Sequence, residues 1–587
     1  MKPRHPWLLL VLACIACDSR CLADSPATAM ALSPVLRDLF ERLNSEKFAD
    51  RESASQQLAN YGQLVRPALI DATRTGQSPE LRSRAAQLLC SLSWAVPEDS
   101  PLVRQALTSY ASTNPEYRAK AIVQLGLIGA PAFEAFIRLL HDEPNDEVRW
   151  SIVHQLHAFT TAEQRHRLQQ LDISADDAPL LAASGWAWLA NDLPRGEALL
   201  NRAADLAVEH PARDLNHIEA PADGESPTTE VQRLLRWLSI RGMHKGDYDA
   251  AVLRTRQAIL HGDQPLSDAM LDLFVIHAEH GPRLGFDEDV RLAEKSFYSP
   301  EMMYVMGRLY ARQNQPLLAT TCYRAAALSA LSTQGTHIRV ARFLLGRRWF
   351  DLAQIECEQA LATSGSEKPY MDADAHMLLS HCAAWQGDDA KAANCLESAL
   401  RAIAQLPRVN PNYASRLRVE LDWHLLRVAS GKHDQAAMPP LVNRLIEYQA
   451  PDPRMGLTAD IEIDVIRALK SLGRKEEAAR RFNRQFDEYR KQLEAEPFNA
   501  EILNNIAWFC ARCEEKREEA VGWSAEAIRL APVDSAYLDT AAEAAAQAGQ
   551  AEVAARYEER ALRLLPGDRF MMAQWVRFKS MSSDRSK

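Results

Sequence analysis

Apolar residues along most of the chain recur at spacings of three and four, which place side chains on one face of an α-helix. Early in the chain one phrase occurs four times: an arginine, a small or aliphatic residue three positions later, and a leucine four positions beyond that. The arginines are Arg51, Arg82, Arg118 and Arg149, at intervals of 31, 36 and 31 residues. Each phrase predicts an amphipathic helix that turns its apolar stripe toward a neighbour.

Glycine and proline residues mark the ends of these predicted helices. Gly62 and Gly129 each follow the leucine of a phrase by four residues, where a glycine commonly ends a helix. Pro67 and Pro131 then stand where a second helix would begin. Paired helices at this period resemble HEAT repeats, and the resemblance predicts a repeat segment at residues 31–160. An irregular helical bundle is the alternative.

A second, stricter repeat fills most of the remaining chain. Residues of one segment reappear 34 positions later in the next: Ala507, Ala520, Ala527, Leu530, Pro532 and Asp534 are matched by Ala541, Ala554, Ala561, Leu564, Pro566 and Asp568. A glycine followed five positions later by an alanine also recurs, at Gly246, Gly387, Gly473 and Gly549. Agreement at so many positions indicates a structural period equal to this spacing.

This pattern resembles the tetratricopeptide repeat, a 34-residue hairpin of two antiparallel helices. Small side chains let the two helix axes approach, and a proline stops the second helix. We expect second helices near Ala198, Ala251, Ala319, Ala353, Ala392, Ala436, Ala478, Ala520 and Ala554. The stretch 264–298 has room for another unit. The resemblance implies an all-α fold, an α-solenoid of helical hairpins in which the HEAT-like segment precedes a tetratricopeptide superhelix over residues 178–574.

Less regular stretches separate and follow these segments. Residues 161–177 are expected to be a linker between the two repeat systems. The polar, proline-bearing stretch 209–231 predicts a long loop inside the superhelix. Residues 575–587 are expected to form a disordered tail.

The first residues have the pattern of an export signal. Lys2 and Arg4 precede an apolar stretch over residues 7–17, and small residues up to Ala23 predict a cleavage site. Residues 1–23 are thus an expected signal peptide. The apolar stretch is too short to span a bilayer, which takes about 20 residues.

We therefore expect an exported protein of bacterial type, periplasmic or secreted, with no transmembrane segment in its mature chain. Residues 24–30 would link the cleavage site to the first repeats. Cys14 and Cys17 each follow an alanine, so a bacterial lipoprotein signal with lipid on one of these cysteines is the alternative.

Composition narrows the classes of partner. The net charge of −10, without a lysine- or arginine-rich tract, argues against nucleic acid as a partner. A chain of 587 residues is too long for one hydrophobic core, so several domains or a repeat array are expected. Three of the ten cysteines lie in the signal, and the other seven are scattered, so we expect no disulfide framework.

Motifs for catalysis or cofactors are weak. Neither a glycine-rich phosphate loop nor a G-x-S-x-G elbow occurs. Cys510 and Cys513 form a C-x-x-C pair, but they lie late in a predicted first helix and no histidine follows, so we expect two structural thiols. His277 and His280 lack two further zinc ligands nearby. We predict a non-enzyme without cofactor or metal, with a redox or metal protein using Cys510 and Cys513 as an alternative.

The tetratricopeptide resemblance implies a docking surface for other proteins or peptides. In that family, first-helix positions line a concave groove, and the aligned positions here are Tyr304, Arg308, Arg312, Ile338 and Arg342. Arginines there suit a carboxylate or an acidic peptide. The lysine and asparagine of the family's two-carboxylate clamp are replaced, so that activity is not implied.

We predict an exported scaffold that docks partner proteins or peptides. A lipid-anchored envelope assembly factor is one alternative function, and arginines that only solvate a helix face are the alternative for the site. The pattern leaves the oligomeric state and the identity of the partner open.

Overall fold

The computed structural model describes most of the chain after residue 33. The described ranges are 34–159, 161–209, 229–261, 267–283, 285–294, 299–328, 333–363, 368–406, 408–448, 458–565 and 568–584. The expected signal peptide 1–23, the linker 24–30 and nearly all of the loop 209–231 lie outside these ranges.

Every regular element within these ranges is a helix, so the prediction of an all-α solenoid of hairpins is confirmed. The chain divides into two compact units, with the boundary between Gln164 and Arg165. No helix among the described residues is both long and apolar enough to cross a membrane.

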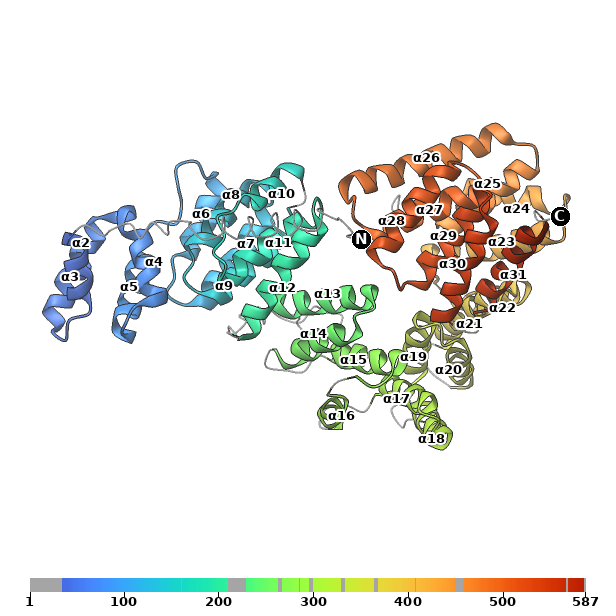
Figure 1. Ribbon diagram of the computed structural model, residues 1–587, viewed down its shortest axis with the longest axis horizontal. Helices are drawn as coiled ribbons and strands as arrows, with labels where there is room; N and C mark the ends of the chain where they lie inside the picture. The colour runs from blue at the N-terminus through green and yellow to red at the C-terminus, as the bar shows by residue number, and fades with distance from the viewer. Residues whose placement is uncertain are drawn as a thin grey trace, which may run out of the picture. The chain divides into compact units, whose positions relative to one another are not determined.

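Unit 1 consists of short helices, most of them joined by short connections, with a longer segment between α5 and α6 (Figure 1). Its helices are α2 (Pro34–Leu43), α3 (Phe48–Asn60), α4 (Arg66–Thr75), α5 (Pro79–Ser91), α6 (Pro101–Tyr110), α7 (Pro115–Ile128), α8 (Phe133–Asp142) and α9 (Asp146–Leu156), with the 3₁₀ helices η2 (Gly62–Val65) and η3 (Ala130–Ala132). Gly129 directly follows α7 and Gly62 lies two residues after the end of α3, and both have positive φ angles, 73° and 55°, as the helix-end prediction required.

The four repeated arginines of unit 1 fasten the turn before their own helix. Each guanidinium group donates to a backbone carbonyl oxygen: Arg51 to Ser45 at 2.8 Å, Arg82 to Gly76 at 2.7 Å, Arg118 to Ser112 at 2.7 Å and Arg149 to Leu140 at 2.9 Å. These carbonyl groups lie in turns or at a helix end, where the helix ladder leaves them without a partner. The arginine therefore recurs because each hairpin turn needs the same donor.

Arg118 also holds a buried carboxylate. Its Nε and Nη2 atoms lie 3.0 and 2.9 Å from the two carboxylate oxygens of Glu143, which is fully buried. The hydroxyl group of Tyr110 donates to the same carboxylate. Burial alone would lower the pKa of Arg118, but the Glu143 carboxylate outweighs that effect and raises it. The pair joins α7 to the end of α8.

Replacing Arg118 with methionine should destabilise unit 1 by about 3–5 kcal/mol, because the Glu143 charge would stay buried without its partner. The matched control is Arg104→Met, at an exposed position of α6. Urea unfolding followed by circular dichroism measures both variants. Adding Glu143→Leu to Arg118→Met should recover much of the loss; equal stability of R118M and R104M would contradict the role of the pair.

Unit 2 is a succession of helical hairpins (Figure 1). The first ten helices are α11 (Ala178–Trp188), α12 (Leu193–Glu209), α13 (Glu230–Lys245), α14 (Tyr248–Leu260), α15 (Ser267–His280), α16 (Phe286–Glu294), α17 (Pro300–Arg312), α18 (Pro316–Ala327), α19 (Gln334–Gly346) and α20 (Phe350–Ala362). They continue with α21 (Lys368–Trp385), α22 (Asp389–Ile403), α23 (Pro411–Gly431), α24 (Met438–Glu447), α25 (Ala459–Ser471), α26 (Lys475–Ala495), α27 (Ala500–Cys513), α28 (Arg517–Leu530), α29 (Ser535–Gln547), α30 (Ala551–Leu564) and α31 (Arg569–Asp584).

The helices α11 to α30 follow one another as ten pairs of a first and a second helix within the described residues, and nine of these pairs are closely packed hairpins. The remaining pair, α15 and α16, meets through side chains such as His277 and Asp289. The stretch 264–298, which the sequence could not align, holds α15 and α16. Helix α17 starts at Pro300 and α19 at Gln334, and the same spacing separates the starts of α28 at Arg517 and α30 at Ala551. The period read from the sequence is therefore the period of these hairpins, whereas the starts of α21 at Lys368 and α23 at Pro411 are farther apart.

Alanine at the predicted positions permits the close approach within most hairpins. Seven of the nine predicted alanines are at most 3% exposed: Ala251, Ala319, Ala353, Ala392, Ala478, Ala520 and Ala554. Ala198 and Ala436 are exposed instead. In the first hairpin Gly196 takes the contact position, since an added Cβ there would lie 2.9 Å from the carbonyl oxygen of Gly185. Ala436 precedes α24, which begins at Met438.

Replacing Ala520 with leucine should lower the free energy of unfolding by about 1–3 kcal/mol, because the added side chain has no space between α27 and α28. Ala525 lies exposed on the same helix, so Ala525→Leu is the matched control for helix propensity. Thermal unfolding of the two variants tests the difference. If A520L were as stable as A525L, close contact at this alanine would not limit the packing.

The first hairpin of unit 2 also contacts much later helices. Leu193 at the start of α12 packs in one cluster with Leu503 of α27 and Leu530 of α28. Arg165 donates to the carbonyl oxygen of Ala495 at 3.2 Å. Helices far apart in the sequence are therefore in direct contact within this unit.

Two segments that were expected to be a linker and a disordered tail contain helices. The expected linker 161–177 contains a helix, α10 (Ala162–Gln169), with Leu168 buried. The expected disordered tail 575–587 is helical up to Asp584, because α31 packs Phe578 into the core of the last hairpin. Residues 585–587 lie outside the described part of the chain.

Candidate docking surface

Two of the five predicted peptide-binding residues belong to the core of the repeats. Tyr304 and Ile338 are 1% and 2% exposed, so their assignment to a peptide-binding groove is wrong. The Tyr304 hydroxyl group donates to the buried carboxylate of Glu356, which also contacts Nδ1 of His337 at 2.6 Å. Tyr304 and Ile338 are one repeat period apart and occupy equivalent positions of α17 and α19. Both of these equivalent positions thus face the core.

The three predicted arginines lie on the exposed side of the same helices. Arg308, Arg312 and Arg342 are all exposed. Arg308 follows Tyr304 by one turn, so the two residues lie near the same face of α17, but Tyr304 is buried whereas the longer Arg308 side chain reaches solvent. Arg308 and Arg342 are equivalent residues of α17 and α19. We call Arg308, Arg312, Arg342 and the neighbouring Arg347 the arginine surface.

Each member of the arginine surface has a different local partner. The guanidinium group of Arg308 lies 5.7 Å from the ring centre of Trp349. Arg312 donates to the carbonyl oxygen of Glu279. Burial raises the pKa of the Glu279 side chain, and the charges of Arg347, Arg308 and Arg312 partly oppose that rise. One carboxyl group thus lies within the field of three arginines.

Arg342 is tied to the next repeat. Its Nη2 atom lies 2.6 Å from Oδ2 of Asp374 on α21, and the hydroxyl group of Tyr413 donates to Oδ1 of the same carboxylate at 2.7 Å. Asp374 is 6% exposed, whereas the Arg342 side chain is 53% exposed. The guanidinium group therefore keeps an open side.

Ion pairs between successive first helices recur along unit 2. They include Arg236–Asp272 at 3.2 Å, Arg342–Asp374 at 2.6 Å, His381–Glu420 at 3.3 Å, Arg427–Asp464 at 3.9 Å and the close pairs Arg339–Glu301 and Arg577–Glu543. Each pair joins one hairpin to the next. By contrast, Arg308 and Arg312 form no ion pair with a described side chain.

The C-x-x-C thiols have the environment of structural cysteines. Cys510 and Cys513 are fully buried in α27. Burial raises the pKa of Cys510 to about 12, and burial also raises the pKa of Cys513. Redox-active thiols need a lowered pKa and access to solvent. The geometry therefore favours a packing role for both side chains.

The two histidines considered as metal ligands have other partners. Nε2 of His277 lies 3.0 Å from Oδ2 of Asp289, and both side chains are buried. His280 stacks on Tyr248 with ring centres 3.8 Å apart, and burial lowers the pKa of His280 to about 4. The described residues contain no group of three or more ligating side chains placed to hold a metal ion.

A buried pair of carboxyl groups lies in the last hairpin. Glu558 of α30 is fully buried and neither oxygen has a donor group among the described residues. Burial raises the pKa of Glu558, and the Asp539 carboxylate raises it further. Asp539 itself accepts a hydrogen bond from Nε2 of Gln574 at 3.1 Å. Burial also raises the pKa of Asp539, to about 6, so Glu558 is the member of the pair that holds its proton at neutral pH.

Replacing Glu558 with glutamine should stabilise unit 2, and the gain should grow with pH. Because the pKa of Glu558 is higher in the folded state, its contribution to stability is fully present only at pH values below its pKa in the unfolded chain, near 4.5. Above that value the cost of protonation rises by at most about 1.4 kcal/mol per pH unit until the folded pKa is passed. Glutamine avoids this cost because it is always neutral.

Urea unfolding at pH 5, 7 and 8 measures the effect, with Glu552→Gln at an exposed position of α30 as the control. A stability difference between E558Q and the parent that stays constant across this range would show that Glu558 is ionised in the native state.

The fold and these surfaces define a helical-repeat protein with an N-terminal HEAT-like unit. The family model described as HEAT repeats matches residues 66–157, which contain α4 to α9. The HEAT resemblance is therefore confirmed for that part of unit 1. None of the curated proteins matches the chain at a significant level.

Several solved tetratricopeptide-type structures are similar to the chain. The TPR domain of P58(IPK) is 12% identical and covers 80% of this chain and 99% of its own, with a TM-score of 0.20. Naa15/Naa10 bound to HypK-THB is 11% identical, with 93% and 96% covered and a TM-score of 0.30. Yeast Tom70 is 10% identical, with 94% and 96% covered and a TM-score of 0.27. Because these structures superpose so loosely, the assignment of unit 2 as a helical-repeat array rests on the hairpins described above.

Proposed function

We propose that this chain is a non-catalytic scaffold that docks an acidic peptide segment of a partner protein on the arginine surface of unit 2. The observation that carries the proposal is the arrangement of Arg308, Arg312 and Arg342 on two consecutive first helices. All three guanidinium groups are exposed, and two form no ion pair with a described side chain.

The chemistry of these groups selects a carboxylate-bearing ligand. A guanidinium group presents donors in a planar fork that matches the two oxygens of a carboxylate. Arg308 and Arg342 repeat at the period of the hairpins, so an extended peptide lying across the helices would meet one after the other. The net charge of the whole chain is −10, so an acidic peptide would be attracted only where arginines gather on the surface.

The hairpin architecture suits this role. Stacked repeats form a long exposed surface whose residues come from one helix in each unit. Such a surface can bind an extended segment over several repeats without a closed pocket. The exposed surface of the stacked first helices is therefore suited to docking an extended peptide.

Export remains part of the proposal and rests on residues 1–23 alone, with a lipid-anchored assembly factor as the alternative. The mass of the mature N-terminal peptide distinguishes cleavage after Ala23 from an acylated Cys14 or Cys17.

A fluorescein-labelled peptide rich in glutamate, with a lysine-rich peptide of the same length as its counterpart, tests the docking surface by fluorescence anisotropy. Arg308→Ala should weaken the acidic peptide by about tenfold or more, because a charge-assisted hydrogen bond contributes about 1.5–3 kcal/mol. Arg324→Ala, at an exposed arginine of the second helix α18, should leave binding unchanged. Equal losses in R308A and R324A would show only non-specific attraction and would overturn the assignment.

A further inference from the structure

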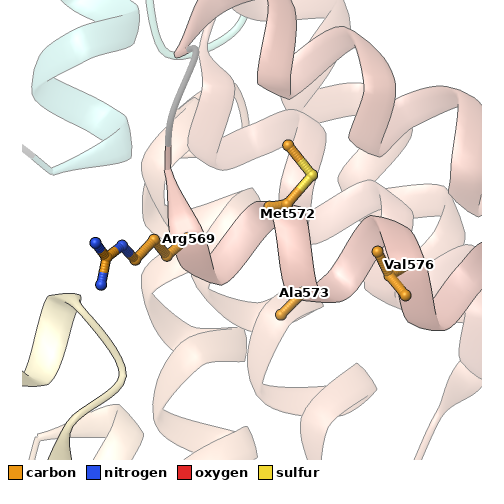
Figure 2. Close-up of a pocket in the computed structure, with 4 residues that line it drawn as sticks. All are labelled: Arg569, Met572, Ala573 and Val576. Carbon is orange, nitrogen blue, oxygen red and sulfur yellow. The ribbon is translucent and has the colours of Figure 1, made fainter.

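The last helix of unit 2 exposes an apolar stripe. Arg569, Met572, Ala573 and Val576 of α31 line an open groove of about 460 Å³ (Figure 2). Met572 is 45% exposed and Val576 is 56% exposed. The opposite side of the same helix is buried, with Met571 at 2% and Phe578 at 0%. One side of α31 thus caps the last hairpin, and the other side leaves large apolar groups in water.

The repeat register shows what normally covers this stripe. Leu538 and Ala542 of α29 lie one repeat period before Met572 and Val576, and they are 1% and 0% exposed. They are covered by the second helix of their own hairpin and by α31: Leu538 clusters with Ala561 and Met571, and Ala542 clusters with Ala554 and Phe578. The stripe of α31 is therefore the face on which one more helical unit would stack, and the described chain supplies none.

Charge distinguishes the helix that could take this place. Helix α31 carries Arg569, Arg577 and Lys579 against one acidic residue, Asp584, in a chain whose net charge is −10. Arg577 is paired with Glu543. Arg569 lies at the edge of the stripe and forms no ion pair within the described ranges. The buried Asp568 carboxylate caps this end of α31, since it accepts a hydrogen bond from the backbone N–H of Met571 at 3.0 Å and pairs with Arg348 at 3.4 Å.

We propose that this stripe docks an amphipathic helix of a partner protein that carries two or three apolar residues at helical spacing and an acidic residue beside Arg569. Arg569 and Val576 are two turns apart, about 10 Å, which a partner helix of three turns covers. The partner would lie where the next repeat would lie and would bury Met572 and Val576 as Leu538 and Ala542 are buried. A second copy of α31 fits poorly, because two basic helices would face each other.

The proposal is independent of the arginine surface, so the two can fail separately. The probe is a fluorescein-labelled 16-residue helical peptide with leucines at i, i+3, i+4 and i+7 and glutamates elsewhere, titrated with the full chain. Its counterpart has lysines in place of the glutamates. The acidic peptide should bind and the basic one should not.

Val576→Glu should weaken the acidic peptide by about tenfold or more, since it places a charge in the apolar contact and repels the glutamates. Arg569→Glu should weaken it and improve the basic peptide. Both positions are exposed, so circular dichroism should show an unchanged fold. Arg308→Ala is the matched control and should leave binding of this helical peptide unchanged. The extended acidic peptide should in turn be unaffected by V576E.

Three results would overturn the proposal. The first is equal binding of the acidic and basic peptides, or binding that V576E leaves intact. The second is sedimentation of the parent, but not of V576E, with vesicles of one part phosphatidylglycerol to three parts phosphatidylcholine, without peptide binding; this would make the stripe a membrane contact. The third is concentration-dependent self-association lost in V576E, which would make it a contact between copies.

Discussion

Close approach of two helices through very small side chains is the constraint on which unit 2 depends. In most hairpins a buried alanine of the second helix lies against the first helix, and in the first hairpin Gly196 and Gly185 take that role. Because the axes are held so near each other, no hairpin encloses a large core of its own. Apolar contacts must then extend to the neighbouring hairpins, and the helices form an array.

Charged side chains join successive hairpins, and those left without a charged partner are available to other molecules. Along unit 2, an arginine or histidine of one first helix pairs with a carboxylate of the next, as in Arg342–Asp374 and His381–Glu420. These pairs lie between half-buried helices, where they fix register more than they add stability. Arg308, Arg312 and Arg569 lack such a carboxylate partner among the described residues. Each proposed surface thus contains at least one arginine that this pairing does not use, although Arg342 and Arg577 take part in it.

The repeats in the sequence made the architecture predictable, but they did not predict which side chains face the core and which face solvent. A regular period with recurring alanines predicted the hairpins, since it reports spacing along the chain. The division between Tyr304 and Arg308 depends on the phase of α17 against its neighbours, which no spacing reveals. Glu356, which anchors Tyr304, is 52 residues away. Helix α31 was missed because its buried face, Met571 and Phe578, is covered by residues of the preceding hairpin.

The contact of Leu193 with Leu503 and Leu530 bears on how this protein can change in evolution. In an open array, duplication or loss of a single unit leaves the remaining interfaces intact, so gene length drifts easily. Here one extra hairpin between α12 and α27 would move Leu193 away from both leucines. Recombination between the similar segments would therefore be penalised, and the number of hairpins in this lineage should be inherited as a fixed character.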